Sequence, residues 1–402
     1  MISLVSLAIA LFAAKNVAAV GSPFGFATGT TGGNSAAQAI PTSAAQLKSW
    51  LEDDVTRNIL LDRTYDFTDT EASPIYMLGK CAGRGLAHPI PSSFSIQEVG
   101  VDLVPPLLLP TRKLPPPASA SNLTKLLSEK AVPDGCKCLF SLCVINFLIR
   151  VSSISKGKGL RLNNVSNVII QNIRISDLNP QYVWGGDALY IDNSSKIWVD
   201  HNYFKNVGRQ FIVTGFGAAK QVTISNNYFD GQSTWSTGCD QHHYWALLFA
   251  GNGDQITFAR NYMYFTAGRG PHIGGTDGYT LTLHMYNNYF NDITGHAIDA
   301  DTGSKILIEG NYFNKVRTPS TGSTKGAAFA PISASMNSQC SATLGRNCVS
   351  NTLAGGSGQL TNTANNGILS SFTASTVKSA SIMDPASVPS FVTSNAGLGK
   401  VN

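Results

Sequence analysis

Charged residues are scarce in this chain, since Asp, Glu, Lys and Arg make up only 13% of its 402 residues. Low charge combined with many Asn, Ser, Thr and Gly residues fits a secreted β protein better than a cytosolic α/β enzyme. No Gly-rich phosphate loop follows a predicted strand, so nothing indicates a nucleotide, a redox cofactor or a nucleic acid as ligand. These absences leave a β-rich extracellular protein as our first expectation.

A hydrophobic run of membrane-spanning length is also missing. Residues 2–14 are apolar, but this run is too short to cross a bilayer. Small residues ending at Ala19 are typical of a signal-peptide cleavage site, although Lys15 follows the apolar run and no basic residue precedes it. We therefore predict that residues 1–19 are a signal peptide and that the mature protein is secreted, with no membrane association.

A repeated phrase dominates the second half of the chain: a short run rich in Val, Ile and Thr leads to an asparagine, and in most cases an aromatic residue follows. The repeat asparagines are Asn172, Asn202, Asn227, Asn261, Asn288 and Asn311, which lie 30, 25, 34, 27 and 23 residues apart. A period of this length indicates stacked coils, and the β-branched runs indicate strands. An antiparallel sandwich would need turn signals about every 8–12 residues, which is shorter than the spacing here.

One buried asparagine per coil can bond to the asparagines above and below it, and so form a ladder along the stack. We therefore predict an all-β fold, a right-handed parallel β-helix with long irregular turns. A capping box at Ser43–Gln46 and the apolar residues up to Leu51 predict a short helix that covers the N-terminal end. We expect a strand at Arg57–Phe67, coils from Lys156 to about Arg317, and an irregular outer tail over residues 318–402.

One segment, residues 72–155, departs from this pattern and holds 10 of the 18 prolines. Leu103–Pro117 is rich in Pro and Leu, and Leu139–Val151 is apolar without turn signals, so we expect neither stretch to continue a coil. We predict one domain over residues 20–402, and we hypothesise that a reading-frame slip or a retained intron produced the atypical segment.

The seven cysteines indicate an oxidising compartment. Cys340 and Cys348 lie close together in a Gly/Ser/Asn-rich stretch and predict a local disulfide, whereas Cys239 needs a distant partner. An odd total leaves one thiol unpaired. Asn-X-Ser/Thr sequences at Asn122, Asn164 and Asn193 permit glycosylation.

Three polar positions recur at equivalent places relative to the repeat asparagines: Asp187, Arg209 and Arg269. In a β-helix the turns of successive coils line a groove beside one sheet, so we expect these side chains to approach one another. His242–Trp245 lies in the widest interval and could form a wall of that groove.

Several phrases, in order and with compatible spacing, resemble the fungal pectin lyases, which belong with the pectate lyases to polysaccharide lyase family 1. The phrases are Lys156–Arg161, Tyr182–Asp187, Ile197–His201, Gly208–Gln210, His242–Trp245 and Gly268–Pro271. The resemblance implies β-elimination in α-1,4-linked methyl-esterified galacturonan, the pectin of plant cell walls. The C5 proton is removed, electron density builds on the C6 ester, and the C4 oxygen leaves, so the products are 4,5-unsaturated oligogalacturonides.

The resemblance also implies roles for individual residues. Arg269 matches the arginine that abstracts the proton, Asp187 matches a calcium ligand of the pectate lyases, and Arg209 stands where those relatives keep a carboxylate. A guanidinium beside Asp187 would neutralise it and repel Ca²⁺, and a methyl ester carries no charge for a metal to neutralise. We therefore predict a monomeric lyase that needs no metal and no cofactor.

Two questions about the site remain open at this stage. Arginine is normally always protonated, so Arg269 is either a base in a transiently neutral form or an electrostatic stabiliser only. The predicted substrate-binding residues are Trp184, Tyr244, Trp245 and His272. The aromatic ones could stack on sugar rings or pack between turns, and His272 replaces the lysine usual in the family.

Three other functions compete with this interpretation. A calcium-dependent pectate lyase would need a carboxylate where Arg209 stands. A polygalacturonase would need clustered acids in the groove, and only Asp299 and Asp301 lie close together. A β-helix that only binds polysaccharide would keep the asparagines and lose Arg269, unless the atypical segment has inactivated a former enzyme.

Overall fold

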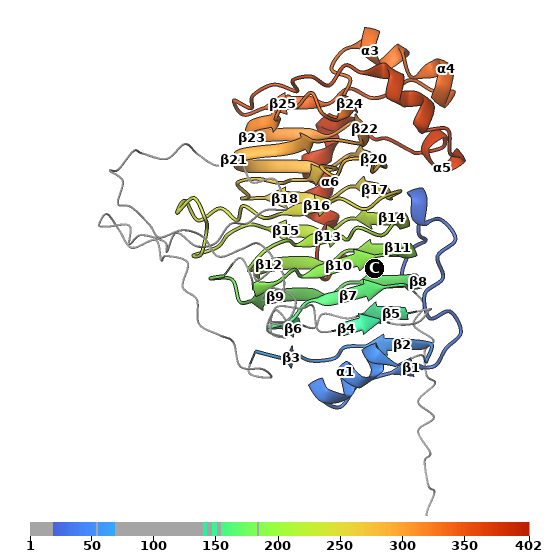
Figure 1. Cartoon of the computed structure of the whole chain (residues 1–402), viewed down its shortest axis with the longest axis vertical. Helices are drawn as coiled ribbons and strands as arrows, with labels where there is room; N and C mark the ends of the chain where they lie inside the picture. Colours follow the sequence, from blue (N-terminus) through green and yellow to red (C-terminus); the bar gives the residue numbers. More distant parts are fainter. Residues whose placement is uncertain are drawn as a thin grey trace, which may run out of the picture.

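The computed structural model describes residues 19–53, 55–68, 140–142, 147–150, 154–182 and 185–401. Figure 1 shows the strands of successive coils stacked along the long axis of the molecule. Residues 1–18 of the predicted signal peptide and most of the atypical segment lie outside the described residues.

One flank of the stack, here called face A, is a 10-stranded sheet in the described part of the chain. In spatial order it contains β1 (Gln38–Ala39), β2 (Arg57–Leu60), β5 (Phe147–Arg150), β8 (Ser166–Gln171), β11 (Ser194–Asp200), β14 (Ala219–Ser225), β17 (Gln255–Ala259), β20 (Leu281–Tyr286), β22 (Ser304–Glu309) and β24 (Ala327–Phe329). Neighbouring strands are parallel, with one strand contributed by each coil.

Two further flanks are joined through the long strand β21 (Tyr289–Ala300). Face B contains β3 (Tyr65–Asp66), β6 (Ile154–Lys156), β9 (Arg174–Leu178), β12 (Tyr203–Val207), β15 (Tyr228–Asp230), β18 (Tyr262–Tyr264) and then β21, which also pairs with β23 (Tyr312–Ser320) and through it with β25 (Thr352–Ala354). Face C contains β4 (Phe140–Leu142), β7 (Leu160–Asn163), β10 (Leu189–Asp192), β13 (Ile212–Thr214), β16 (Leu247–Phe249), β19 (His272–Ile273) and the end of β21. The chain is therefore a parallel β-helix, as the sequence predicted.

Apolar side chains at matching places in successive coils fill the interior. On face A, Val199 pairs with Ile224 on one side and Ile170 on the other, and all three are fully buried. On face B the rings of Phe204 and Phe229 stack with centroids 5.0 Å apart. Branched and aromatic side chains pack well in a pleated parallel sheet, and burying each one stabilises the fold by about 1.5–3 kcal/mol.

An asparagine ladder runs inside the corner between faces A and B. Its members are Asn202, Asn227, Asn261, Asn288, Asn311 and Asn351, and each side-chain nitrogen donates to Oδ1 of the next asparagine at 2.9–3.0 Å. The same oxygen also accepts from the backbone nitrogen of the preceding asparagine. Because every buried amide has partners, the ladder fixes the register of successive coils.

The sequence placed the start of this ladder wrongly. Asn202 Oδ1 accepts from the backbone nitrogen of Ile173 at 3.0 Å, so Ile173 occupies the ladder position in that coil. Asn172 has a left-handed backbone with φ of 58°, and its side chain accepts from the backbone nitrogen of Gly399. Asn351, which the repeat did not reveal, extends the ladder at the other end.

The N-terminal helix α1 (Ala44–Glu52) confirms the predicted cap. Ser43 Oγ accepts from the backbone nitrogen of Gln46 at 3.1 Å, and Leu47 and Leu51 are buried in the main core. The single strand expected at residues 57–67 is instead two strands, β2 and β3. They belong to different faces, so the chain must turn a corner between them.

Two other expectations were wrong. The apolar stretch at residues 139–151 was expected to lie outside the coils, yet β4 and β5 within it pair with β7 and β8. The sequence of a strand inside a parallel sheet is a near-continuous apolar run, because both faces of the strand are buried. The missing turn signals therefore did not exclude a strand. The tail after residue 317 was expected to be irregular, yet it supplies β24 and β25.

The ends of the chain also contain short helices. These are α3 (Ala334–Ser338), α4 (Ser341–Leu344), α5 (Ser375–Lys378), α6 (Val388–Asn395) and the 3-10 helices η1 (Gly25–Ala27), η4 (Asn366–Ser371) and η5 (Pro385–Ser387). Cys340 and Cys348 form the predicted disulfide, and Cys239 is disulfide-bonded as well. Within the described residues, no helix combines the length and apolar character that crossing a membrane requires.

Candidate active site

Polar and aromatic side chains gather where successive coils turn into face C. Asp187, Gln210 and Trp245 each lie two residues before β10, β13 and β16, and these strands pair in register from their first residues. Arg269 takes the corresponding place in the next coil, because Leu248 pairs with His272 and this register puts Arg269 opposite Trp245. The four side chains therefore occupy equivalent positions on neighbouring coils.

Asp187 and Arg209 are in contact at this place. Asp187 Oδ2 lies 3.8 Å from Arg209 Nη1, and Asp187 Oδ1 accepts from the backbone nitrogen of Gln210 at 2.8 Å. Burial raises the pKa of the Asp187 carboxyl, while the charge of Arg209 and the bond from Gln210 act in the opposite direction. Two of the three predicted catalytic residues, Asp187 and Arg209, thus form an ion pair.

The guanidinium of Arg269 is withdrawn from solvent. Only 6% of the residue is exposed, and its guanidinium carbon lies 4.7 Å from the centroid of the Trp245 ring. Burial lowers the pKa of Arg269, Tyr244 opposes this effect, and the nearby charge of Arg209 lowers the pKa further. Burial and the charge of Arg209 thus disfavour the protonated guanidinium, whereas Tyr244 and the face of the Trp245 ring favour it.

The backbone of Arg269 is also unusual. Its φ of 50° lies in the left-handed region, where residues other than glycine are uncommon. Its backbone nitrogen donates to Nε2 of His296 in the next coil at 3.1 Å, which fixes that nitrogen of His296 as the acceptor. The same left-handed conformation recurs at other positions in the coils, such as Arg260 and Phe265, so it does not by itself distinguish the site.

A buried histidine in the widest turn, His243, forms hydrogen bonds to two residues of the site. Nε2 of His243 lies 2.7 Å from the carbonyl oxygen of Arg209 and 2.9 Å from that of Trp245, so Nε2 carries the hydrogen and donates to both. Burial lowers the pKa of His243 to about 4, so the imidazole is neutral at the pH of most assays. His243 therefore positions both Arg209 and Trp245.

His272 is already paired with a carboxylate. Its Nδ1 lies 2.6 Å from Oδ2 of Asp299, and Thr321 Oγ1 donates to the other oxygen of Asp299 at 2.8 Å. Burial alone would raise the pKa of Asp299, but the hydrogen bond and charge of His272 hold it at about 2. Asp299 is thus a supporting residue for His272, and its charge offsets any positive charge there.

The remaining predicted residues divide into two groups. Tyr244 and Trp245 both border Arg269, and their rings meet edge to face with centroids 5.0 Å apart. Trp184 lies outside the described residues.

The sequence did not single out Gln210, His243 and His296, although the first two stand inside the quoted motifs. Gln210 is fully buried, and in the described part of the chain both polar atoms of its side chain have no hydrogen-bond partner.

The surroundings of Asp187 do not suit a calcium ion. Ca²⁺ takes six to eight oxygen ligands, whereas the carboxylate of Asp187 faces a guanidinium at 3.8 Å. Among the described residues, no group of three or more His, Cys, Asp or Glu side chains could hold a metal.

Comparison with known proteins gives the family. The family model described as pectate lyase matches residues 147–401, which is more than half of the chain. The probable pectin lyase F-2 of Aspergillus terreus is 42% identical over 404 residues, covering 100% of this chain and 79% of that protein. The probable pectin lyase F of Emericella nidulans is 37% identical over 401 residues, covering 100% of this chain and 81% of its relative. The chain belongs to the pectate lyase family.

Solved structures show the same fold at lower sequence identity. A pectate lyase from Bacillus sp. N165, determined in complex with trigalacturonate, matches with a TM-score of 0.52 and 20% identity, covering 95% of this chain and 100% of that chain. Pectate lyase C from Erwinia chrysanthemi, determined with Ca²⁺, matches with a TM-score of 0.52 and 18% identity, covering 94% and 97%.

Proposed function

We propose that this protein is a pectin lyase that cleaves α-1,4-linked methyl-esterified galacturonan by β-elimination without Ca²⁺. The observation that carries the proposal is the position of Arg209, whose guanidinium lies 3.8 Å from Asp187 and whose charge adds to the effect of burial in lowering the pKa of Arg269. The names of the similar fungal proteins support the choice of pectin as substrate.

In the proposed reaction, Arg269 accepts the C5 proton of the esterified galacturonate unit on the reducing-end side of the scissile bond, whose C4 carries the leaving oxygen. The electron pair of the C5–H bond moves toward the C6 ester carbonyl, and Arg209 supplies positive charge where the enolate oxygen develops. The C4–O bond then breaks, a C4–C5 double bond forms, and the leaving oxygen takes a proton from water or from the guanidinium. Hydrogen and electrons balance without any oxidant or cofactor.

The chemistry of an ester explains why a fixed cation suffices. A galacturonate carboxylate already carries negative charge and resists the loss of the C5 proton, so a divalent cation helps to neutralise it. A methyl ester is neutral before the proton leaves, and only the charge that develops during the reaction needs stabilisation. Arg209, held in place by Asp187 and by the contact of its carbonyl with His243, meets that smaller demand.

The proposal is tested by following the ultraviolet absorbance of the unsaturated product. Highly methylated pectin and polygalacturonate serve as the two substrates, each with and without a chelator. We expect activity on methylated pectin and no effect of the chelator. Activity that the chelator abolishes, or that appears only on polygalacturonate, would overturn the proposal.

We also propose that the protein is secreted as a monomeric glycoprotein whose lyase domain spans residues 20–402. The apolar N-terminal run supports secretion, and Asn164 and Asn193 are exposed, with the side-chain nitrogen of Asn193 donating to Oδ1 of Asn164. Peptide mapping of the natively secreted protein tests three points together: a first residue of Val20, glycans at these asparagines, and peptides across the atypical segment. Clean peptides across residues 103–151 would refute the hypothesis that a reading-frame slip or a retained intron produced the atypical segment.

A further inference from the structure

A row of tyrosines lies on face B, apart from the candidate active site. Tyr203, Tyr228 and Tyr262 pair in register at the starts of β12, β15 and β18. Their ring centroids are 5.1 Å and 4.8 Å apart, and Arg174 extends the row, with its guanidinium 5.3 Å from the ring of Tyr203. Tyr289 and Tyr312 continue the row on the next two coils, so one residue type repeats on five successive coils and the row ends at the cation Arg174.

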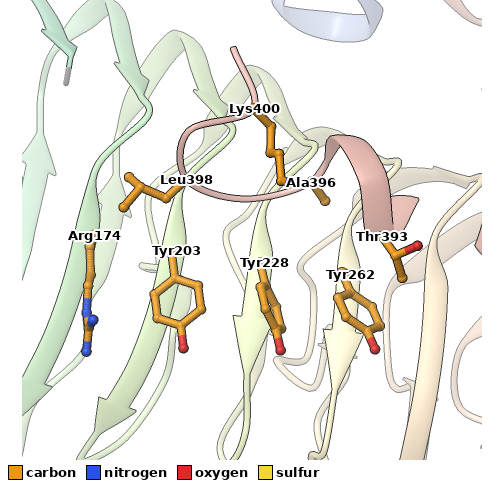
Figure 2. A pocket seen from close by; sticks show the side chains of 8 residues that line it. All are labelled: Arg174, Tyr203, Tyr228, Tyr262, Thr393, Ala396, Leu398 and Lys400. Carbon is orange, nitrogen blue, oxygen red and sulfur yellow. The ribbon is translucent and has the colours of Figure 1, made fainter. Parts of the chain in front are cut away.

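The row forms one side of a pocket. The cavity has a volume of about 360 Å³, and the C-terminal arm after α6 borders it with Leu398 and Lys400. Figure 2 shows the tyrosine rings side by side with their hydroxyls pointing the same way, and the arm passing across their bases. Two backbone bonds fix the arm, from Gly397 to the carbonyl of Asn226 and from Gly399 to the side chain of Asn172.

The charges at this pocket are positive and uncompensated. In the described part of the chain, neither Arg174 nor Lys400 has a carboxylate within 4.0 Å. Asp230, a carboxylate in contact with the row, is already bound by the hydroxyl of Tyr203 at 2.6 Å and by Lys205 at 2.8 Å. A negatively charged ligand would therefore meet two cations that have no ion-pair partner among the described residues, although Arg174 Nε donates to Ser176 Oγ at 3.1 Å.

We propose that this pocket is an accessory binding site for unesterified galacturonate stretches of the pectin chain. Aromatic rings offer apolar surface to the C–H groups of sugars, and Arg174 and Lys400 can bind carboxylates. The row from Arg174 to Tyr262 covers three steps of about 4.8 Å between strands, which suits an oligosaccharide rather than a single sugar. The inference rests on the proposed function only for the identity of the polymer.

The position of the pocket gives it a role in polymer capture. Tyr203 opens β12, and Arg209 follows two residues after β12 ends, so the pocket and the active site lie at opposite ends of the same strand. Natural pectin mixes esterified and free uronates. A site for free carboxylates would hold the polymer while the active site acts on a neutral, esterified stretch, and local tethering raises the effective substrate concentration.

Binding is tested with the double variant Arg174→Gln/Lys400→Ala and a matched control, Lys220→Ala/Lys305→Ala, which removes two exposed lysines from face A. Both pairs are placed in an Arg269→Lys background so that the probe is not consumed. The probe is a set of unesterified polygalacturonate fragments, measured by calorimetry, and fully methylated fragments serve as a second probe.

We expect the dissociation constant for unesterified fragments to rise about tenfold in the pocket variant and to stay constant in the control. Added salt should weaken the binding that remains in the control protein, and affinity for methylated fragments should not change. Equal affinity of the two variants for unesterified fragments would overturn the proposal, and so would equal loss of affinity for both kinds of fragment.

Activity measurements separate this inference from the proposed function. With Arg269 intact, the pocket variant should act on short fully methylated oligomers like the wild type, while its KM for partly esterified polymer rises. An unchanged KM for that polymer would contradict the capture role. If methylated oligomers are not cleaved by any variant, the proposed function fails. The binding comparison still tests whether the pocket binds unesterified fragments.

Discussion

Arg209 Nη1 lies 3.8 Å from Asp187 Oδ2, although 21 residues separate the two in the chain. The contact joins two neighbouring coils at the edge where they enter face C. It places a fixed positive charge beside a buried carboxylate, and it gives the site the electrostatic character from which the metal-free reaction was inferred.

The variant Arg209→Asp should create a calcium site. Two carboxylates would then face each other where one is now compensated by a guanidinium, and Ca²⁺ prefers oxygen ligands. We expect millimolar Ca²⁺ to raise the melting temperature of this variant, because a ligand that binds only the folded state stabilises it. The melting temperatures of the wild type and of Arg209→Gln should not respond to Ca²⁺. A calcium-dependent rise in the wild type would contradict our description of the site.

The variant Arg269→Lys should lose most of the lyase activity. Lysine keeps a positive charge but cannot reproduce the planar guanidinium that lies against Trp245. We expect kcat on methylated pectin to fall about 100-fold or more, with an unchanged circular dichroism spectrum. The control Arg63→Lys changes an exposed arginine that pairs with Asp62 and should keep full activity. Retention of most activity by Arg269→Lys would exclude Arg269 as the base.

A buried glutamate should make stability depend on acid pH. Burial alone would raise the pKa of Glu309, but hydrogen bonds from Arg346 and His284 hold it at about 2, below its ordinary value of 4.5. Since the folded pKa is depressed, the stabilisation is fully present above pH 4.5 and is lost as the pH falls through about 2.

The variant Glu309→Gln measures this contribution. It should destabilise the protein by about 3 kcal/mol at neutral pH, because Arg346 and His284 lose the carboxylate that they share. The difference from wild type in denaturant unfolding should shrink between pH 4.5 and pH 2. Glu52→Gln, at an exposed pair with Lys48, should cost less than about 1 kcal/mol. A loss for Glu309→Gln that is independent of pH would argue against the depressed pKa.

The asparagine ladder should be costly to interrupt. The variant Asn261→Leu removes a side chain that bonds to Asn227, Asn288 and the carbonyl of Ile224, so several buried polar groups lose their partner. We expect a loss of about 3–5 kcal/mol in the free energy of unfolding, measured by denaturant titration. The control Asn366→Leu breaks one exposed bond to Gln339 and should change stability little. Similar stabilities of the two variants would mean that the ladder does not hold the coils.

Much of the fold was predictable because its pattern is local and repeats. Each coil carries its own β-branched run and asparagine, so the period alone indicated a parallel stack. The errors fell where the pattern does not repeat. Asn172 follows a strand like the other asparagines, but it lies one residue before the ladder position, which only the register with Asn202 reveals. A shift of one residue reverses the direction of a side chain, and a single sequence does not fix it.

The candidate site was partly predictable for a similar reason. Asp187 and Arg269 stand at equivalent points of the repeat, and Arg209 lies one residue before the equivalent point Gln210, so their approach largely followed from the coil length. The supporting contacts did not follow. His243 bonds to the carbonyl of Arg209 from the next coil, and His296 accepts from the backbone of Arg269. Such bonds depend on the path of irregular turns, which have no period.

The sequence by itself determined the coiled architecture, because each repeat encodes one turn of the helix and the asparagines stack only in parallel register. The tertiary structure alone decided which charges meet. It set the contact of Arg209 with Asp187 and the burial of Arg269, and it brought Lys400 beside the tyrosines of face B. The physical reason is that hydrogen bonding between coils is specified locally, whereas burial and charge proximity depend on every segment that packs around a group.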